Sequence, residues 1–474
     1  MAPDDVTWLP AWRLAALVSA KQISPVELTQ HFLDRINEHD HKLNSFLTVS
    51  GDLAMQQAKD AESAIQGGRS LGPLAGVPLA VKDQFDTKGI RTTSGSLLFA
   101  EHVPEHDSVY VERLRAAGAV IVGKTNTPEF GLFWRTCNKL GPECLNPWNT
   151  DRTSGGSSGG AAASLAAGLV PAGVGSDRGG SIRIPSAFCG VVGLLPSAGR
   201  VPNHGGFGRA LWFRGVGPMT RDVRDAALIL GILAGGDRRD PTCSWDHVPE
   251  YSEGLESAKL TDLRIGWWHD SGDGAEHDGR VMEVVAKAVH DLEPLSAAVV
   301  ETRFVDTVLA KEVFWVLNDA ERYGMFGQAL LEDPAKRCLL CPYVIERLEH
   351  GRIISAAEVL RALYAWQQVK AEAMELFEHV DVVVSPTVGQ VAPPVAQETP
   401  RHSITSSTYM ANFVGLCAIT LPCGLVDGLP VGLQVISKPG KEALMLRVAR
   451  AVEELLGQLG PCRGWSAPAA TLET

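Results

Sequence analysis

Residues 153–164 read TSGGSSGGAAAS, and this short stretch decides how the rest of the chain is interpreted. It places four glycines and five hydroxyl side chains in twelve positions. Glycine loses more conformational freedom on folding than any other residue, so a folded protein concentrates it only where the backbone requires it. A flexible linker, a phosphate-binding loop and the wall of an active site all use such a composition. The surrounding sequence has to decide among the three.

The composition of the whole chain is that of a globular protein. Its 474 residues are 45% hydrophobic and 21% charged, which is ordinary for a folded soluble protein. Length alone suggests about three domains, but no linker divides the chain, so we expect one large domain. The net charge of −12 disfavours nucleic acid as a partner, because phosphate binding requires a basic surface.

The sequence also predicts a cytoplasmic protein without a membrane anchor. No apolar run approaches the ~20 residues of a membrane span, and the N-terminal MAPDDVTWLPAW lacks the regions of a secretory signal. The nine cysteines are scattered through hydrophobic segments, which is typical of reduced, buried thiols. Cys338 and Cys341 form a C-x-x-C pair in a stretch that reads as helix, and no second pair stands at zinc spacing. We therefore expect no metal and no cofactor.

Short apolar runs alternate with amphipathic stretches in the first half of the chain. LAGVPLAVKD and AAGAVIVGKTN are apolar runs that end in polar residues, as buried strands of a parallel or mixed sheet do. PEHDSVYVERLRAAG between them reads as a helix. Earlier, SPVELTQHFLDRINEHD begins with Ser24 as N-cap and Pro25 at the first helical position. After residue 218, helices dominate around further strand candidates. The pattern predicts the α/β class.

Residues 118–125, GAVIVGKT, match the phosphate-binding pattern G-x-x-x-x-G-K-[ST] without a mismatch. That pattern works through a glycine-rich loop followed by a helix. Here the four middle residues are Ala-Val-Ile-Val and the segment continues into NTPEFG, which favours a buried strand that ends in a loop. The sequence therefore does not predict a nucleotide site.

A second glycine-rich segment, GVGSDRGGSIRIPSAFCGVVGLLPSAGRV, occupies residues 173–201. Ser181 follows two glycines there, and backbone N–H groups beside such a serine can converge on an oxyanion; a tight glycine turn is the alternative. A serine nucleophile needs a base, yet neither glycine-rich segment contains a histidine and no G-x-S-x-G elbow is present in the arrangement that an α/β-hydrolase needs. Lys82, at the end of an apolar run, can serve if burial lowers its pKa.

Taken together, these segments resemble the amidase signature family, whose catalytic apparatus is a Ser–cis-Ser–Lys triad. The matching stretches are PLAVKD, RTSGGSSGGAAAS and GSDRGGSIRIPSAFCGVVGL, supported by GKTNTPEFG, GPMTRDVRDAALIL and YMANFVGLCAITLPCGLVDGLPVGLQVI. They extend from the first helix to about residue 455. The resemblance implies a single α/β domain with a mixed central β-sheet covered by helices on both faces. We expect N-terminal helices over 1–65, the signature core over 66–220, and the remaining sheet with substrate-side helices over 221–474.

The resemblance also implies roles for individual residues. Ser181 is expected to be the nucleophile, and Ser157 a bridging serine that follows a cis Gly156–Ser157 peptide bond. Lys82, neutral at rest, is expected to draw a proton through Ser157 and return it to the leaving amine. These roles explain the glycine-rich composition of residues 153–164, because glycine allows the backbone to approach the reacting groups closely.

Neighbouring residues are expected to support this triad. The oxyanion hole implied by the resemblance consists of the backbone N–H groups of Arg178, Gly179, Gly180 and Ser181. We expect Ser154 and Ser158 to hold hydrogen bonds to the backbone and to Lys82, and Asp177 and Arg183 to form an ion pair that stiffens the loop. The family commonly has a small or apolar residue at the position of Arg178, so its guanidinium is expected to influence substrate preference.

The substrate is less well defined by the sequence. Family members hydrolyse aliphatic, aromatic, fatty and peptide amides, carbamates, ureas and allophanate, and one branch is the glutaminase subunit of a tRNA-dependent amidotransferase. The aromatic segments FGLFWRT, GGFGRALWFRG and VFWVLNDAERYGMF favour a hydrophobic pocket, or else they fill the core. The predicted pocket residues are Phe130, Phe133, Trp134, Trp212 and Phe213.

The main hypothesis is therefore an amidase. We expect a monomeric or homodimeric hydrolase that cleaves a small-molecule carboxamide through a serine acyl-enzyme, with a hydrophobic or aryl amide, or a carbamate (urethane), as substrate. A glutamine-specific site should contain polar groups instead of aromatic ones. The alternatives are a glutaminase-type subunit of an amidotransferase complex and a non-catalytic amidase-like protein.

Overall fold

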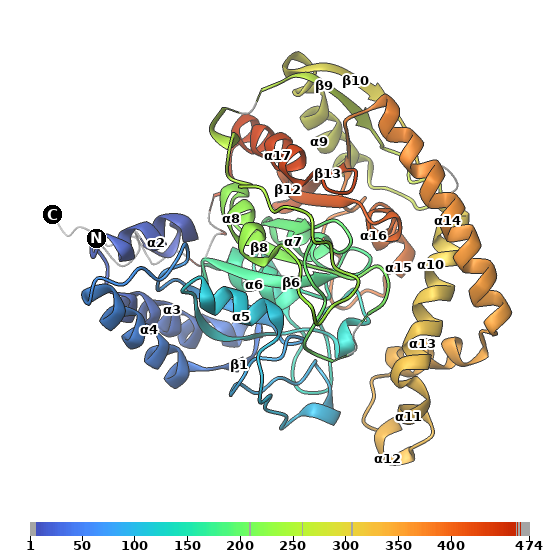
Figure 1. Cartoon of the computed structure of the whole chain (residues 1–474). Helices are drawn as coiled ribbons and strands as arrows, with labels where there is room; N and C mark the ends of the chain where they lie inside the picture. The colour runs from blue at the N-terminus through green and yellow to red at the C-terminus, as the bar shows by residue number, and fades with distance from the viewer. Residues whose placement is uncertain are drawn as a thin grey trace.

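The centre of the molecule is a mixed β-sheet built from strands along almost the whole chain (Figure 1). The computed structural model describes residues 6–207, 210–257, 259–304 and 307–460, together with residues 462 and 465. In these ranges the main sheet has eleven strands. Their order across the sheet is β1 (Phe46–Val49), β3 (Val120–Thr125), β2 (Pro78–Lys82), β6 (Ala172–Asp177), β8 (Gly215–Thr220), β7 (Val192–Leu195), β12 (Cys417–Val426), β13 (Leu429–Ser437), β11 (Val382–Pro386), β9 (Leu260–Trp267) and β10 (Ser296–Glu301).

Strand directions make this sheet mixed. β2 runs parallel to both of its neighbours, β3 and β6, and β9 runs parallel to β10 and β11. The central strands from β6 to β11 pair antiparallel. A separate two-stranded sheet consists of β4 (Leu145–Asn146) and β5 (Asn149–Thr153) and leads into the glycine-rich residues 153–164. The predicted α/β class with a mixed central sheet is confirmed.

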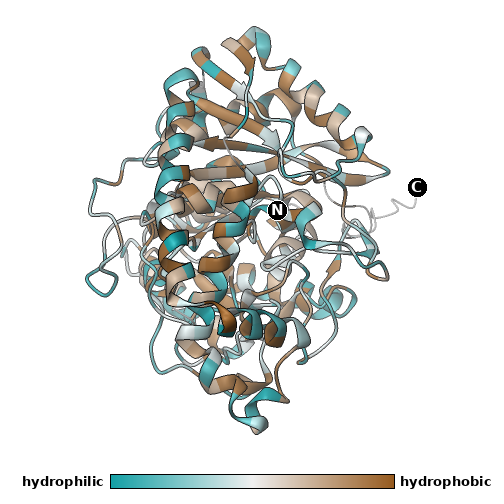
Figure 2. Cartoon of the chain, turned by 90° about the vertical axis from the view of Figure 1, so that its right-hand side faces the viewer, coloured by the Kyte–Doolittle hydropathy of each residue, from teal (hydrophilic) through white to brown (hydrophobic). Residues whose placement is uncertain are grey.

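Helices cover both faces of the sheet. One face packs against α2 (Ala11–Ser19), α5 (Val109–Ala116), α8 (Val223–Leu233), α9 (Gly279–His290) and α17 (Glu442–Leu456). The other face packs against α4 (Gly51–Gln66), α6 (Gly159–Ala166), α7 (Arg183–Cys189), α10 (Thr307–Arg322), α14 (Ala356–His379) and α16 (Tyr409–Val414). Brown and teal alternate along these helices in Figure 2, as amphipathic covering helices require.

The alternation of side chains along β2 decides where the candidate site lies. Leu79 and Val81 pack into the core beneath the first group of helices, whereas Ala80 packs with residues of α6. Because successive side chains of a strand point to opposite faces, Lys82 shares the face of Ala80. It therefore ends β2 on the side covered by α6 and α7.

The second half of the chain adds a helical layer to the same side. α10 and α14 lie against α13 (Pro342–Ile353), with the short α11 (Gln328–Leu331) and α12 (Pro334–Arg337) at the far end (Figure 1). A single π-helical turn, Tyr323–Gly327, joins α10 to α11, and such turns are frequent at functional sites. α3 (Pro25–His39) starts at the predicted residue, and α15 (Arg401–Thr405) precedes α16.

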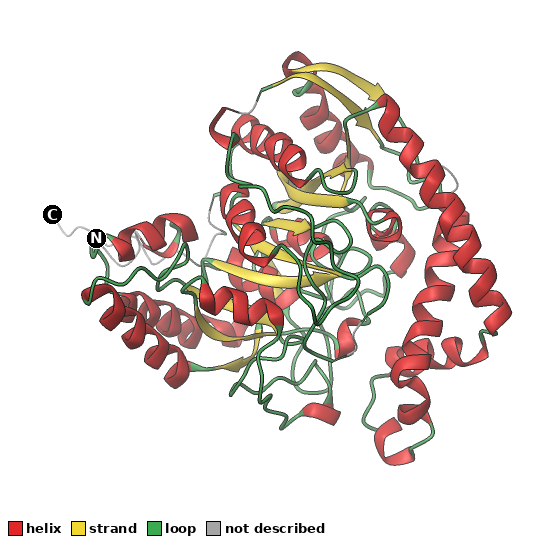
Figure 3. Cartoon of the chain, in the orientation of Figure 1, coloured by secondary structure: helices red, strands yellow, loops and turns green. Residues whose placement is uncertain are grey.

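Long loops fill the space between the sheet and this layer. They include residues 83–108 and 126–144 and appear as the green segments at the lower edge of the view in Figure 3. Residues 120–125 form the buried strand β3, which confirms the strand interpretation of GAVIVGKT. Cys341, from the C-x-x-C pair, is the N-cap of α13. Among the described residues, no helix is long and apolar enough to cross a membrane.

Candidate active site

Lys82 is a fully buried lysine whose amine faces three serines. Its side chain is 0% exposed, and its Nζ lies 2.7 Å from Ser157 Oγ, 2.9 Å from Ser158 Oγ and 3.1 Å from Ser176 Oγ. Burial lowers the pKa of Lys82 well below its usual value; the positive charge of Arg214 lowers it further, and Asp177 opposes both effects. The surroundings therefore favour the neutral amine, which has a lone pair that can accept a proton.

Ser157 lies directly before α6, in the glycine-rich segment. The Gly156–Ser157 peptide bond is cis, and Ser157 is 1% exposed. The glycines around it are required by space: a Cβ on Gly159 would lie 2.3 Å from Thr136 Oγ1, and one on Gly160 would lie 2.4 Å from the backbone nitrogen of Asn126. The segment is thus neither a linker nor a phosphate loop but a closely packed wall beside Lys82.

Ser181 lies on the loop between β6 and α7 and is the partly exposed member of the three. The backbone N–H of Ser158 donates to the carbonyl oxygen of Ser181 at 3.0 Å, which ties the two serine-bearing segments together. Ser181 also borders two cavities, one of which is bordered by Ser157 as well. The arrangement places an accessible hydroxyl in front of a buried hydroxyl and a buried amine.

The backbone around Ser181 offers fewer oxyanion donors than the sequence suggests. The N–H of Gly180 donates to Asp177 Oδ1 at 2.7 Å, so this predicted oxyanion donor is engaged by a side chain. Among the described residues, no protein acceptor faces the N–H of Gly179 or of Ser181. Gly180 is needed for another reason: its φ is 119°, and a Cβ there would lie 2.4 Å from Thr408 Oγ1.

Asp177 and Arg183 form a buried ion pair beneath the Ser181 loop. Arg183 Nε lies 3.1 Å from Asp177 Oδ2, and both side chains are fully buried. Burial alone would raise the pKa of Asp177, but the guanidinium and the surrounding N–H donors hold it below its usual value. Arg183 also donates to Gln434 Oε1 and Asn412 Oδ1, each at 2.6 Å. The pair thereby anchors the loop to β13 and α16.

The two further serines play different structural parts. Ser158 Oγ contacts Lys82 Nζ and donates to the carbonyl oxygen of Ser176 at 3.2 Å. Ser154 Oγ donates to the carbonyl oxygen of Cys144 at 2.9 Å. Its hydroxyl bonds to backbone and not to the Lys82 amine, so Ser154 supports the wall of the site.

Two cavities meet at Ser181 and Arg178. The predicted pocket residues Phe133 and Trp134 border the first cavity, and Phe130 borders the second. Trp212 and Phe213 border neither; they line a different cavity, where the Phe213 ring packs 5.0 Å from the ring of Phe314. These two aromatics belong to the helical layer's core, which their sequence context cannot reveal.

Several residues that border the cavities carry no sequence motif. α10 contributes Phe314, Trp315, Asn318 and Arg322, and the remainder include Arg214, Arg401 and Tyr409. Phe314, Asn318 and Arg322 are spaced by four residues, so they lie on one helix face. Arg178 donates to Asn318 Oδ1 at 2.9 Å and pairs with Glu321. The pocket is therefore more cationic than the aromatic segments suggest.

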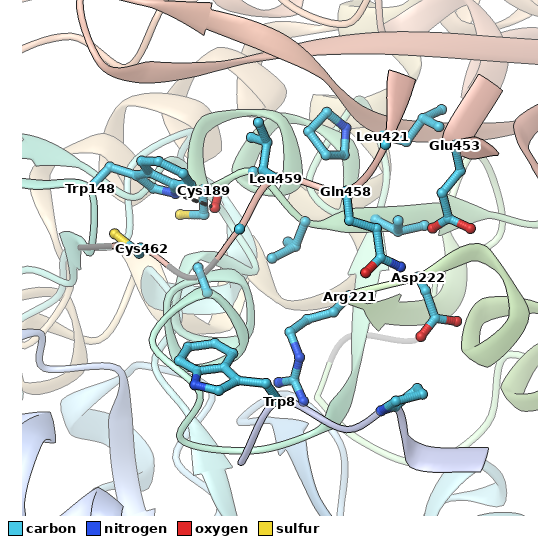
Figure 4. A pocket seen from close by; sticks show the side chains of 18 residues that line it. Trp8, Trp148, Cys189, Arg221, Asp222, Leu421, Glu453, Gln458, Leu459 and Cys462 are labelled. Atoms are coloured by element: carbon cyan, nitrogen blue, oxygen red, sulfur yellow. Dashed lines mark hydrogen bonds between the residues drawn. The ribbon is translucent and has the colours of Figure 1, made fainter. Parts of the chain in front are cut away.

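A separate cavity lies away from these residues (Figure 4). Trp148, Cys189 and Cys462 border one side of it, and Arg221, Asp222 and Glu453 border the other. None of the three triad candidates borders it. Arg221 is occupied there, because it donates to the carbonyl oxygens of Val170 at 2.8 Å and Thr7 at 3.0 Å. This cavity lies between the N-terminal segment and the sheet.

Comparison with known proteins agrees with this geometry. The family model described as Amidase matches residues 27–446. A glutamyl-tRNA(Gln) amidotransferase subunit of Heliobacterium modesticaldum is 36% identical over 94% of this chain and 96% of that protein. Among solved structures, a bacterial aryl acylamidase of the amidase signature family has a TM-score of 0.88 at 28% identity, covering 95% of this chain and 97% of that one.

A further solved structure comes from a study of a vestigial protein complex and the evolutionary origins of an s-triazine catabolic enzyme. It has a TM-score of 0.88 at 29% identity and covers 96% of this chain and 100% of that one. The family match spans most of the chain, and the sheet, the cis-serine segment and the buried lysine occur together as that family requires. The chain belongs to the amidase signature family.

Proposed function

We propose that this chain hydrolyses the C–N bond of a linear carboxamide through an acyl-enzyme on Ser181, with Ser157 as proton relay and Lys82 as base. The observation that carries the proposal is the 2.7 Å contact between the fully buried Lys82 amine and Ser157 Oγ, since Ser157 and the partly exposed Ser181 border the same cavity. A buried neutral amine can accept a proton near neutral pH, whereas an exposed lysine is almost entirely protonated there.

The proposed reaction has two stages. Lys82 takes the Ser157 proton while Ser157 Oγ takes the Ser181 proton, and Ser181 Oγ attacks the carbonyl carbon. The backbone N–H groups of Arg178, Gly179 and Ser181 are the proposed donors for the oxyanion. When the C–N bond breaks, the proton returns through Ser157 to the leaving nitrogen. Water then attacks the ester by the same relay and frees the carboxylic acid and Ser181.

Hydrophobic aryl amides and carbamates are one candidate substrate group. Support comes from the aromatic residues Phe130, Phe133 and Trp134 at the cavities and from the similarity to a bacterial aryl acylamidase. The guanidinium groups of Arg178, Arg322 and Arg401 beside Ser181 weaken this assignment, since an apolar leaving group would desolvate them without pairing them.

A glutaminase-type subunit of an amidotransferase complex is the second candidate. A glutamyl-tRNA(Gln) amidotransferase subunit is similar to this chain over nearly its full length, and guanidinium groups border both cavities. This support is stronger than the support for aryl amides. In that case the chain would act with a partner protein rather than as a monomer or homodimer. The third alternative, a non-catalytic relative, is disfavoured because all three triad candidates are present and lie together.

Turnover by the purified chain tests these assignments. We expect it alone to release amine or ammonia from at least one of three substrates, an anilide, a nitrophenyl carbamate or glutamine, and Ser181→Ala to abolish the release. Activity on glutamine that appears only with a co-purifying partner would favour the amidotransferase assignment. Turnover that persists in Ser181→Ala would contradict the proposed nucleophile.

A further inference from the structure

Four guanidinium groups surround Ser181. Arg178 and Arg322 border both cavities, Arg401 borders the first, and Arg214 borders the second. Arg178 has its own carboxylate, Glu321. The others are less well compensated, which makes the two cavities an unusually cationic environment in a chain whose net charge is −12.

Arg322 combines deep burial with hydrogen-bond donors that lack partners. Its side chain is more than nine-tenths buried, at 6% exposed, and its Nε and Nη1 have no hydrogen-bond partner among the described residues. The nearest carboxylate is Asp319, 3.6 Å from Nη1. Asp319 lies closer to two other side chains, at 2.7 Å from Arg347 Nη2 and 2.7 Å from His350 Nδ1. Arg322 therefore borders the cavities as a buried guanidinium whose ion pair is long and whose Nε and Nη1 donors are unsatisfied.

Two other residues beside Ser181 also carry buried hydrogen-bond donors that lack a partner. Asn318 borders the first cavity, and Arg214 borders the second. The Nδ2 atom of Asn318 and the Nη2 atom of Arg214 are buried and have no hydrogen-bond partner among the described residues. All of these atoms are donors. A buried donor without a partner is unfavourable, and more so when it is charged. An anionic acceptor in the cavity would satisfy Arg322 and Asn318 together.

Acidic groups are missing where an ammonium ion would need them. Within the described part of the chain, no Asp or Glu side chain borders either cavity. Glu321 is bonded to Arg178 and to the backbone of Leu211. A zwitterionic amino acid would find donors for its carboxylate but no carboxylate for its ammonium group, which would instead lie near several guanidinium groups.

From this arrangement we infer that the substrate is a small carboxamide that carries a carboxylate and no ammonium group, with Arg322 and Asn318 binding the carboxylate while Ser181 attacks the amide. The inference rests on the proposed amide hydrolysis and adds its substrate class; because glutamine carries an ammonium group, the inference excludes glutamine as substrate and opposes the glutaminase-type candidate. Phe314, Asn318 and Arg322 on one face of α10 would then set specificity, with the aromatic ring packing against the connecting methylene groups. The burial of Arg322, which lowers its pKa through desolvation and through neighbouring Arg178, agrees with a site completed by an anion.

Matched amides test the inference. Glutaramate, glutaramide and glutamine share one carbon chain and differ in an anionic, a neutral and a zwitterionic end; succinamate, succinamide and asparagine form a shorter set. Each competes with a neutral fluorophosphonate probe for Ser181, with labelling followed by intact mass, and hydrolysis is measured as ammonia release. We expect the anionic amide of one set to protect Ser181 roughly 10- to 100-fold better than its neutral or zwitterionic counterpart.

Substitutions separate the carboxylate contact from general damage. Arg322→Gln should reduce the preference for the anionic over the neutral amide about tenfold or more. Arg337→Gln is the matched control, because Arg337 pairs with Glu349 at 2.8 Å outside both cavities, and it should keep the preference. Labelling without competitor reports whether each variant is folded. If Arg322→Gln fails to fold, the wild-type competition decides.

The outcomes distinguish this inference from the proposed function. Equal protection by the anionic and neutral amides in both sets, or stronger protection by glutamine or asparagine, overturns the inference and leaves the acyl-enzyme proposal standing. An unchanged preference in a folded Arg322→Gln variant overturns the role of Arg322. Absence of any probe adduct on Ser181 overturns the proposed function itself, and with it the inference that depends on it.

Discussion

The Lys82 amine is surrounded by hydroxyl oxygens rather than carboxylates. Ser157, Ser158 and Ser176 contact it, while the adjacent Asp83 faces away and accepts from the backbone N–H of Thr93 at 3.0 Å. Alternation along a strand produces this separation. Without a carboxylate in contact, desolvation dominates, and the pKa of Lys82 falls well below its usual value. The amine is therefore suited to act as a base.

The two triad serines should respond differently to substitution. Ser181→Ala removes the atom that forms the acyl-enzyme, so a fluorophosphonate probe should leave no adduct. Ser157→Ala keeps that atom and loses the relay, so labelling should persist at a rate about 10²- to 10⁴-fold lower, the range of general-base contributions. Intact mass spectrometry over time measures both. Identical, complete loss of labelling in two folded variants would leave the assignment of nucleophile and relay unsupported.

At the residue scale, local motifs were predictable and distant contributions were not. Lys82, Ser157 and Ser181 stand in continuous signature segments, so the sequence locates all three. The engagement of the Gly180 N–H by Asp177 depends on loop conformation, which a motif does not encode. Arg322 lies more than a hundred residues from Ser181 and reaches it only because α10 packs over the loop. Its surrounding sequence has no feature that predicts this.

At the scale of the elements, a glycine in the first turn of α6 allows this helix to begin in close contact with the backbone of neighbouring segments. A Cβ on Gly160 would lie 2.4 Å from the backbone nitrogen of Asn126 and 2.5 Å from the carbonyl oxygen of Ser45. Backbone atoms cannot rotate away as a side chain can. The close approach of α6 to these segments therefore depends on a glycine at this position.

Gly160→Ala should accordingly destabilise the fold. We expect a loss of about 1–3 kcal/mol in the free energy of unfolding, the usual effect of overpacking, measured by urea denaturation. Gly51→Ala is the matched control: Gly51 begins α4, and a Cβ there meets nothing within 4 Å. That variant should be neutral or stabilised by up to about 1 kcal/mol. Equal stability of the two variants would show that the wall around Ser157 can relax.

Elements were predicted well where their hydrophobic period was clear. β2, β3 and α5 follow directly from apolar runs and an amphipathic stretch. The aromatic segments were harder, because an aromatic side chain serves a core and a pocket equally well. Phe130 borders a cavity, whereas Phe213 packs among Phe314, Trp366 and Phe413. The packing of the helical layer decides between the two outcomes.

For the molecule as a whole, the buried lysine couples folding to pH. The unfolded chain carries Lys82 as an ammonium ion below pH ~10.4, and the folded chain favours the neutral amine. Unfolding therefore takes up a proton between the lowered pKa and the unfolded one. In this window the contribution of Lys82 to the free energy of unfolding becomes more favourable as the pH rises.

Comparison with Lys82→Met isolates this contribution. The free energy of unfolding of the wild type, relative to the Met variant, should increase by up to about 1.4 kcal/mol per pH unit between pH 7 and 9. Urea denaturation at three pH values measures the slope, and the other titrating groups cancel in the difference. A difference independent of pH would mean that Lys82 stays protonated in the folded state.

The overall architecture was predictable because strand and helix patterns persist along the whole chain and agree with a family resemblance. The order of the strands is less accessible: β12 lies next to β7 although more than two hundred residues separate the two strands in sequence. The same long-range packing brings α10 and α15 over Ser181. Substrate preference depends on that packing, and for this reason the sequence predicts the reaction better than the substrate.

The most direct test of the central claim is the pH dependence of Ser181 labelling in the wild type and in Lys82→Arg. The wild-type rate should rise through an apparent pKa well below that of free lysine, because only the neutral amine accepts the relayed proton. Lys82→Arg keeps the charge but does not deprotonate, so its labelling should be at least about a hundredfold slower at every pH. Labelling of folded Lys82→Arg at a rate close to wild type would contradict the role of Lys82 as the base.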